Sequence, residues 1–182
     1  MPGPNPIIIR NVSHLTDARY FAAMEVDWIS IALTDDPVSF SRWHAMREWI
    51  SGVKLAAELA TAEESLVAKT IIDANPEGII TDNIDIIHLT GGMALFILTE
   101  KILQENENFA QIISYVNYNK DNGFLFSNPE AIYLDANWTR EMIFDLKQKN
   151  YNGGICLHAS GELAAGMKDF SEMDEILELI RN

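Results

Sequence analysis

The feature that most constrains the fold of this chain is a series of short apolar runs, each separated from the next by a helix-like or turn-rich stretch. Ile7-Ile8-Ile9 opens the series with three β-branched residues, and Trp28 to Leu33 is the next run. Runs of this length and composition are typical of buried strands. The predicted strands cover residues 7–11, 28–33, 53–58, 78–82, 93–99, 123–127, 131–135 and 153–158.

The stretches between these runs predict helices at most positions. Thr61 to Glu64 has the spacing of a capping box, which begins a helix. Residues 84–90 leave room for one or two helical turns only, and Asn128-Pro129-Glu130 is too short for a helix before the seventh strand. The predicted helices cover residues 15–25, 37–50, 61–75, 105–118, 138–150 and 170–180.

Strands that alternate with helices pair in parallel through right-handed crossovers. Eight of them predict an α/β fold of the closed (βα)₈ type, a compact TIM barrel with some helices shortened or missing. The chain has 182 residues and no strong linker, so we expect one domain over residues 1–182. A doubly wound open sheet is the alternative, although the glycine-rich loop that such folds carry after the first strand is absent.

Charge and cysteine content exclude several classes of function. The chain carries 27 acidic and 13 basic residues, a formal net charge of −14, which argues against binding to nucleic acid and to anionic membrane surfaces. The single cysteine, Cys156, cannot form an internal disulfide, which is typical of cytoplasmic proteins. The N-terminus lacks the pattern of a signal peptide, and no apolar run approaches the length of a membrane span. We therefore expect a cytoplasmic protein, and the sequence indicates no cofactor.

Charged residues follow several of the predicted strands, where TIM barrels place their active sites. Arg10 could hold a substrate carboxylate or phosphate by a two-pronged contact, or pair with a carboxylate at the same end of the barrel. Glu58, Asp82, Glu100 and Asp135 are those carboxylates. They could bind a divalent metal or form an acid/base pair. Capping and solvation explain them more simply, so no metal site is predicted.

His158 is the best single acid/base candidate, because it ends the eighth strand and an imidazole titrates near neutral pH. Asp135, at the end of the seventh strand, is the carboxylate candidate for catalysis. The alternative for His158 is a hydrogen-bonded structural role. Cys156 shares the strand face of His158, but no third group is visible in the sequence, so a buried apolar role is favoured for the thiol. Trp28, Trp43, Trp49 and Trp138 are interpreted as packing between helices and barrel.

Two segments resemble phosphoribosylanthranilate isomerase. The first is IIRNVSHLTDARYFAAMEVDWISIAL, from Ile8 to Leu33, and the second is ASGELAAGMKD, from Ala159 to Asp169. They match the opening pattern of that family and its Ser-Gly-(x)-Glu-x₃-Gly-x-Lys-Asp string after the eighth strand, the latter with one residue deleted. The resemblance implies a (βα)₈ barrel and an aldose–ketose isomerisation in tryptophan biosynthesis, which needs both a general acid and a general base.

The residues that the family uses for this chemistry differ in this chain. The cysteine base aligns with Arg10, and the glycine after it aligns with Asn11. The aspartate acid at the end of the sixth strand aligns with Ser127. Arginine is a poor base and serine a poor acid near neutral pH. The aspartate of the eighth strand aligns with Leu157.

The phosphate-binding features are kept only in part. The family's glycine pair after the seventh strand is replaced by Leu134-Asp-Ala-Asn137, which adds a carboxylate near the expected anion. Ser160-Gly161 retains the turn before the last helix, where backbone amides could hold a phosphate. A plain turn with a helix cap is the alternative for these two residues.

We therefore expect a divergent relative of phosphoribosylanthranilate isomerase that has lost or replaced the isomerisation. A small phosphorylated or carboxylate metabolite would bind between Arg10, Asn11, Ser127 and the Ser160-Gly161 turn. A working isomerase that uses substitute residues is the first alternative. A non-catalytic interaction or scaffold protein is the second, because missing helices would expose apolar barrel wall and favour a partner or a homodimer.

Overall fold

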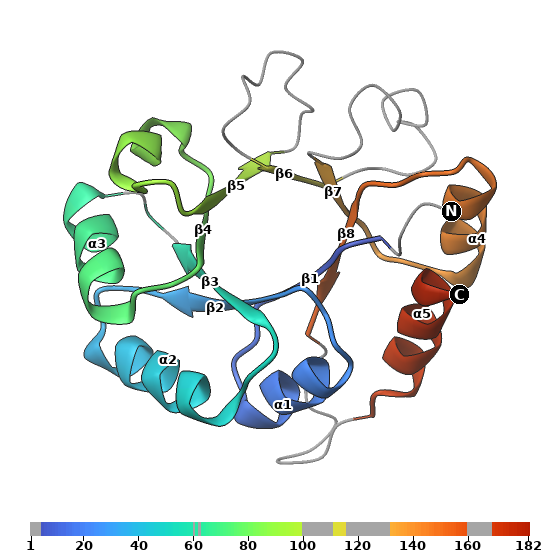
Figure 1. Cartoon of the computed structure of the whole chain (residues 1–182), viewed down its shortest axis with the longest axis horizontal. Helices are drawn as coiled ribbons and strands as arrows, with labels where there is room; N and C mark the ends of the chain where they lie inside the picture. Colours follow the sequence, from blue (N-terminus) through green and yellow to red (C-terminus); the bar gives the residue numbers. More distant parts are fainter. Residues whose placement is uncertain (1–4, 60, 62, 100–110, 116–131, 160–168) are drawn as a thin grey trace.

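The computed structural model describes residues 5–59, 61, 63–99, 111–115, 132–159 and 169–182. In this part of the chain, parallel strands close into a barrel in the order β1 to β8, and β8 pairs with β1 (Figure 1). The predicted α/β barrel is confirmed, and the open doubly wound sheet is excluded. The strands are Ile7–Arg10 (β1), Trp28–Leu33 (β2), Lys54–Leu59 (β3), Gly78–Thr81 (β4), Ala94–Thr99 (β5), Gln111–Tyr115 (β6), Ile132–Asp135 (β7) and Gly154–His158 (β8).

Helices lie around the outside of the ring of strands (Figure 1). The second helix begins as its sequence predicts: the Asp36 carboxylate accepts a hydrogen bond from the Val38 amide at 3.0 Å, and Pro37 occupies the first turn. A short 3₁₀ helix, Ile84–Leu89, connects β4 to β5. The α-helices are Leu15–Ala23 (α1), Pro37–Trp49 (α2), Glu64–Lys69 (α3), Arg140–Gln148 (α4) and Ser171–Arg181 (α5), and a π-helical turn, Thr70–Ala74, extends α3. None of the described helices combines the length and apolar character needed to cross a membrane.

The sixth strand lies earlier in the chain than the sequence predicted. β6 pairs with β5 through Gln111 and Phe96, and with β7 through Tyr115 and Asp135. The helix predicted over 105–118 is therefore wrong for residues 111–115, because pairing on both sides satisfies their backbone in the extended form. The strand predicted over 123–127 lies outside the described residues. The sixth strand of the ring is β6, which pairs directly with β7.

Side chains alternate between the two faces of each strand, as a barrel requires. On β1, Ile7 and Ile9 point outward into the main core between strands and helices, whereas Ile8 points into the barrel. On β8, Ile155 and Leu157 point outward, and Cys156 points inward. The inward residues form a second apolar cluster inside the ring: Ile8, Trp28, Ala56, Ile80, Phe96, Ile113, Tyr133 and Cys156.

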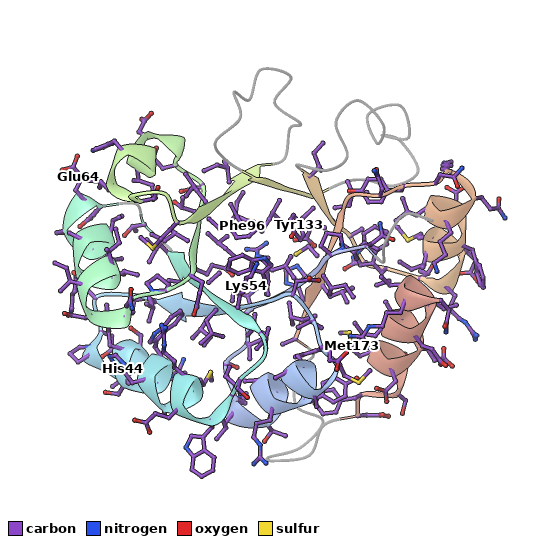
Figure 2. The ribbon with its side chains drawn as sticks, in the orientation of Figure 1. His44, Lys54, Glu64, Phe96, Tyr133 and Met173 are labelled. Carbon is purple, nitrogen blue, oxygen red and sulfur yellow. The ribbon has the colours of Figure 1, made fainter. Side chains whose placement is uncertain are left out.

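Three aromatic rings fill much of this interior. Phe96 packs edge-on against Trp28 at 5.0 Å and against Tyr133 at 5.6 Å between ring centroids. Figure 2 shows Phe96 and Tyr133 inside the ring of strands. A Cβ atom at Gly154 would lie 2.3 Å from Cδ1 of Tyr133, so only glycine leaves room for that ring. The interior is a packed core, and the polar residues lie at its carboxyl end.

The four tryptophans have different environments. Trp43 is fully buried between α2 and the barrel and donates its indole N–H to the Ala74 carbonyl at 2.9 Å, as helix–barrel packing predicts. Trp138 is partly buried against the same core. The prediction is wrong for Trp28, which packs inside the ring, and for Trp49, whose residue surface is 65% exposed.

Candidate functional site

A polar layer covers the carboxyl end of the barrel interior. Arg10, Glu58, Asp135 and His158 come from β1, β3, β7 and β8, in each case at or next to the last residue of the strand. Each follows an inward-facing residue at a spacing of two, so strand alternation points these side chains into the mouth. The strands thus bring together one guanidinium, two carboxylates and one imidazole.

Arg10 forms the centre of this layer. Its Nη2 lies 2.5 Å from Glu58 Oε1, its Nε lies 3.4 Å from Glu58 Oε2, and its Nη1 lies 3.1 Å from Asp135 Oδ2. The side chains of Arg10, Glu58 and Asp135 are 14%, 12% and 7% exposed. Burial lowers the pKa of Arg10, but the bonds and charges of Glu58 and Asp135 outweigh burial and raise it. The guanidinium is therefore a fixed positive charge that joins β3 to β7 across the mouth.

Ser30 on β2 extends the network on the Glu58 side. Its hydroxyl donates to Glu58 Oε2 at 2.7 Å and accepts a hydrogen bond from the Asn11 amide at 3.2 Å. Asn11 has a φ of +58°, in the left-handed region that asparagine tolerates better than most residues. The turn after β1 is thereby tied to the carboxylate layer.

His158, the register partner of Arg10 on β8, also contacts Asp135. Its Nε2 is 2.9 Å from both Oδ1 and Oδ2 of Asp135, and its Nδ1 is 3.3 Å from the Asn11 side-chain nitrogen. These contacts fit an imidazole that carries its proton on Nε2 and accepts from Asn11 on Nδ1. The His158 side chain is 44% exposed, so this end of the network faces solvent.

Cys156 lies one inward position below His158 on β8, in register with Asp135 on β7. The thiol is fully buried, and burial raises its pKa well above the usual range, with the Asp135 carboxylate adding to the effect. Ligand atoms of Asp135, Cys156 and His158 all lie within 4.8 Å of one another. Cys156 and His158 share one face of β8, as their spacing predicted, and Asp135 supplies from the neighbouring strand the third group that was not visible in the sequence.

A shallow cleft of about 480 Å³ opens beside this layer. It is lined by the turn after β7, including Asn137 and Trp138, by His158, and by Met173 and Ile176 of α5. The Trp138 indole donates to the Cys156 carbonyl at 2.8 Å and so fixes the turn against β8. The exposed side of His158 therefore faces a space of small-molecule size.

The structure brings some of the predicted site residues together at the mouth and places others elsewhere or outside its described part. Arg10, Asn11, Asp135 and His158 lie together at the mouth, and Arg10 forms the carboxylate pair that the sequence offered as an alternative to ligand binding. Asp82 is exposed beyond the end of β4. Three predicted ligand-binding residues and one carboxylate lie outside the described residues: Ser127, Ser160, Gly161 and Glu100.

Two alignments to the family change with the structure. Ser127 was aligned with the acid at the end of the sixth strand, but β6 ends at Tyr115, so that alignment is wrong. Leu157 was aligned with the aspartate of the eighth strand, but its side chain points outward into the main core between strands and helices. The polar side chain at the mouth of β8 is that of His158. Ser30 was not among the predicted site residues. It could have been found only because it lies two residues after Trp28 on β2 and therefore points to the same inner face.

The fold is that of phosphoribosylanthranilate isomerase structures. The enzyme from Pyrococcus furiosus matches with a TM-score of 0.72 and 11% sequence identity, over 98% of this chain and 99% of that chain. The enzyme from Thermococcus kodakaraensis matches with a TM-score of 0.71 and 12% identity, over the same shares. A phosphoribosylanthranilate isomerase in complex with reduced 1-(o-carboxyphenylamino)-1-deoxyribulose 5-phosphate matches with 0.70 and 9%, over 97% of this chain and 98% of that chain. The resemblance in the sequence is therefore confirmed as a structural match over nearly the whole chain.

The sequence itself has diverged far from these proteins. No protein-family profile matches the chain, and no curated protein sequence matches it. A truncated 3-deoxy-D-arabino-heptulosonate 7-phosphate synthase from Thermotoga maritima also shares the fold, with a TM-score of 0.60 and 12% identity over 98% of this chain and 84% of that chain. Because different reactions occur on this fold, the function has to be argued from the site.

Proposed function

We propose that this chain keeps the fold of phosphoribosylanthranilate isomerase and does not catalyse the aldose–ketose isomerisation. The observation that carries this proposal is the pairing of Arg10 with two carboxylates, since Arg10 aligns with the family's cysteine base. Arg10 is held by Glu58 and Asp135 at 2.5 and 3.1 Å. A guanidinium whose pKa is raised above its already high value cannot accept a proton near neutral pH.

The general acid has no replacement on the sixth strand. The family places an aspartate at the end of this strand, and the segment from Gln111 to Tyr118 reads QIISYVNY. It contains neither aspartate nor glutamate. The sixth strand at 111–115 therefore lacks the acid, as did the segment 123–127 that the sequence had predicted for this strand. An isomerisation that needs both a donor and an acceptor of protons lacks both groups at the family's positions.

The charge of the mouth also disfavours the family's substrate, which is an anion. Arg10 contributes one positive charge, and Glu58 and Asp135 contribute two negative charges, so the layer with a neutral imidazole carries a net charge of about −1. An anionic metabolite at Arg10 would have to displace one of these carboxylates. We therefore propose that Arg10 braces the barrel mouth rather than holding a phosphate.

The test is direct turnover of phosphoribosylanthranilate by the purified full chain, followed by the loss of anthranilate fluorescence. The Thermococcus kodakaraensis enzyme serves as the positive control, and complementation of an auxotroph lacking the isomerase is the matching test in cells. We expect no turnover above the uncatalysed rate. We expect the same for Arg10→Cys, because the acid is still missing. Turnover at a rate near that of the control enzyme would contradict the proposal.

A working isomerase with substitute residues is the second candidate. It is favoured by one observation: His158, 44% exposed, is bonded to the buried Asp135 at 2.9 Å. An imidazole oriented by a carboxylate is the usual arrangement of a general base. If turnover is seen, His158→Gln should abolish it while the distant His44→Gln leaves it unchanged. Equal activity of both variants would exclude this candidate.

The interaction alternative is favoured by exposed apolar side chains on the outer face of the barrel. Trp49 on α2 is 65% exposed, and Ile72 in the π-helical turn is 77% exposed. A Thermotoga maritima relative is described as a dimeric phosphoribosylanthranilate isomerase from which monomers were generated. Sedimentation over a range of concentrations tests whether this chain forms a homodimer, and Trp49→Ser should weaken any dimer that uses this face.

A further inference from the structure

We propose that Asp135, Cys156 and His158 form a binding site for a single zinc ion at the mouth of the barrel. Their ligand atoms lie within 4.8 Å of one another. Ligand atoms around a tetrahedral zinc ion lie roughly 3.3–3.8 Å apart, given bonds of about 2.0–2.3 Å. His158 Nε2 lies 2.9 Å from each Asp135 oxygen, so a small side-chain adjustment would admit the ion.

The backbone holds these three residues on rigid elements. Asp135 and Cys156 are register partners on neighbouring parallel strands, and His158 is two residues beyond Cys156 on the same face. Strands fix ligand positions better than loops do. Cys156 is fully buried and His158 is 44% exposed, so the ion would contact the interior on one side and water on the other. Three protein ligands with one open position are typical of zinc sites that bind a further small ligand.

The donor types select the metal. A thiolate, an imidazole and a carboxylate together suit zinc, whereas magnesium and calcium prefer oxygen donors alone. Binding of a divalent ion also brings the net charge of the layer closer to zero. With Cys156 as thiol and His158 neutral, Arg10, Glu58 and Asp135 leave a net charge of about −1. A divalent ion that replaces the thiol proton would bring the layer to about zero.

The neighbouring contacts fit ligation by His158 Nε2. Arg10 bonds Oδ2 of Asp135 at 3.1 Å, which leaves Oδ1 for the ion. Asn11 lies 3.3 Å from Nδ1 of His158. When Nε2 binds a metal, Nδ1 carries the proton and needs an acceptor, and rotation of the Asn11 amide would present its oxygen there. Asn11 would then be a positioning residue for the ligand.

A cysteine nucleophile is the competing interpretation of the same residues. The Cys156 thiol has no exposed surface, so a substrate could not reach it. Its pKa is raised by burial, which favours the unreactive thiol. A metal ion resolves both difficulties, because it is small and it deprotonates a coordinating thiol outright.

The experiment uses the full chain purified without metal and titrated with Zn²⁺ by calorimetry, and with Co²⁺ by absorbance. Cys156→Ala and His158→Gln remove ligands. His44→Gln is the matched control, because His44 is an exposed histidine on α2, far from the ring interior (Figure 2). Far-UV circular dichroism and urea denaturation of each variant confirm that it is folded. We expect one Zn²⁺ per chain, a rise in Tm with Zn²⁺, and a thiolate-to-cobalt charge-transfer band with the strong visible bands of tetrahedral Co²⁺.

The variants separate the site from adventitious binding. Cys156→Ala should lose the charge-transfer band, and both ligand variants should bind Zn²⁺ more than about 100-fold more weakly, while His44→Gln binds as the native chain does. Asn11→Ala should weaken binding by about 10- to 100-fold without loss of the band. Absence of the band from the native chain, or Zn²⁺ affinity in folded Cys156→Ala and His158→Gln equal to that of the native chain, would overturn the proposal.

Discussion

Replacement of Arg10 by methionine is the most informative single change, because it leaves the shape of the mouth largely intact and removes its only described cation. Three contacts join the guanidinium to carboxylates, at 2.5, 3.1 and 3.4 Å. After the change, Glu58 and Asp135 face each other across the mouth without compensation. Ser30 still donates to Glu58, and His158 still contacts Asp135, but neither spans the two strands.

The magnitude follows from burial. Removing one partner of a buried ion pair costs about 3–5 kcal/mol, because the other charge stays desolvated and unpaired. The side chains of Arg10, Glu58 and Asp135 retain 14%, 12% and 7% of their exposure, so water screens part of this cost. We expect a loss of about 2–4 kcal/mol in the free energy of unfolding. For a domain of this size, that loss lowers Tm by roughly 5–15 °C.

Urea denaturation followed by circular dichroism measures the change, with the midpoint and the slope analysed separately. A double-mutant cycle isolates the interaction: Arg10→Met, Glu58→Leu, and both together. Removing both partners replaces the pair with apolar groups, so the double variant should be more stable than the sum of the single losses predicts. We expect a coupling energy of about 1–3 kcal/mol.

Arg140→Met is the matched control. Arg140 pairs with Glu175 at 3.6 Å, and both side chains are more than half exposed, at 59% and 56%. A pair of this kind contributes at most about 1 kcal/mol. The reasoning is refuted if Arg10→Met is no more destabilising than Arg140→Met, or if the cycle at Arg10 and Glu58 is additive.

Three further predictions concern residues in and around β8. Gly154→Ala places a Cβ atom 2.3 Å from the buried Tyr133 ring and should destabilise the chain by about 2–3 kcal/mol in urea denaturation; a neutral result would mean that the ring has room to move. Trp138→Phe removes the 2.8 Å hydrogen bond to the Cys156 carbonyl and should lower the free energy of unfolding by about 1 kcal/mol, with an unchanged midpoint as the contrary outcome. Because burial raises the pKa of Cys156, the thiol stays protonated in the folded chain while it ionises in the unfolded chain above about pH 8.5. Stability in EDTA should therefore fall as pH rises above that value, by up to about 1.4 kcal/mol per pH unit relative to Cys156→Ala, and parallel pH profiles of the two proteins would contradict this.

Local pattern predicted most of the barrel correctly, and it failed where pairing partners decide the structure. Runs such as Trp28 to Leu33 and Gly154 to His158 are apolar, bounded by turns, and stand where they were expected. The segment 111–115 was predicted as part of a helix over residues 105–118, between two apolar runs interpreted as strands. It is a strand because β5 and β7 offer it backbone partners on both sides. Such pairing joins residues that are far apart in the chain, and local sequence does not record it.

The site shows the same division. Strand ends predicted that Arg10, Glu58, Asp135 and His158 would lie at one mouth, and they do. Their partners were not predictable, because Arg10 had several carboxylates within reach of the same face. Which carboxylates pair with Arg10 depends on the stagger between strands, because the stagger sets the height of each side chain along the barrel axis.

What the sequence by itself determined is the alternation of strands and helices, the strongly acidic composition, and the residue types at the ends of the strands. These follow from local periodicity and chemistry, which each segment carries independently of the others. The tertiary structure alone decided that Arg10 is neutralised by two carboxylates, and that Asp135 joins Cys156 and His158 in one cluster. The physical reason is ring closure: β8 pairs with both β7 and β1, which places Cys156 beside Asp135 and His158 beside Arg10, although long stretches of chain separate β1, β7 and β8.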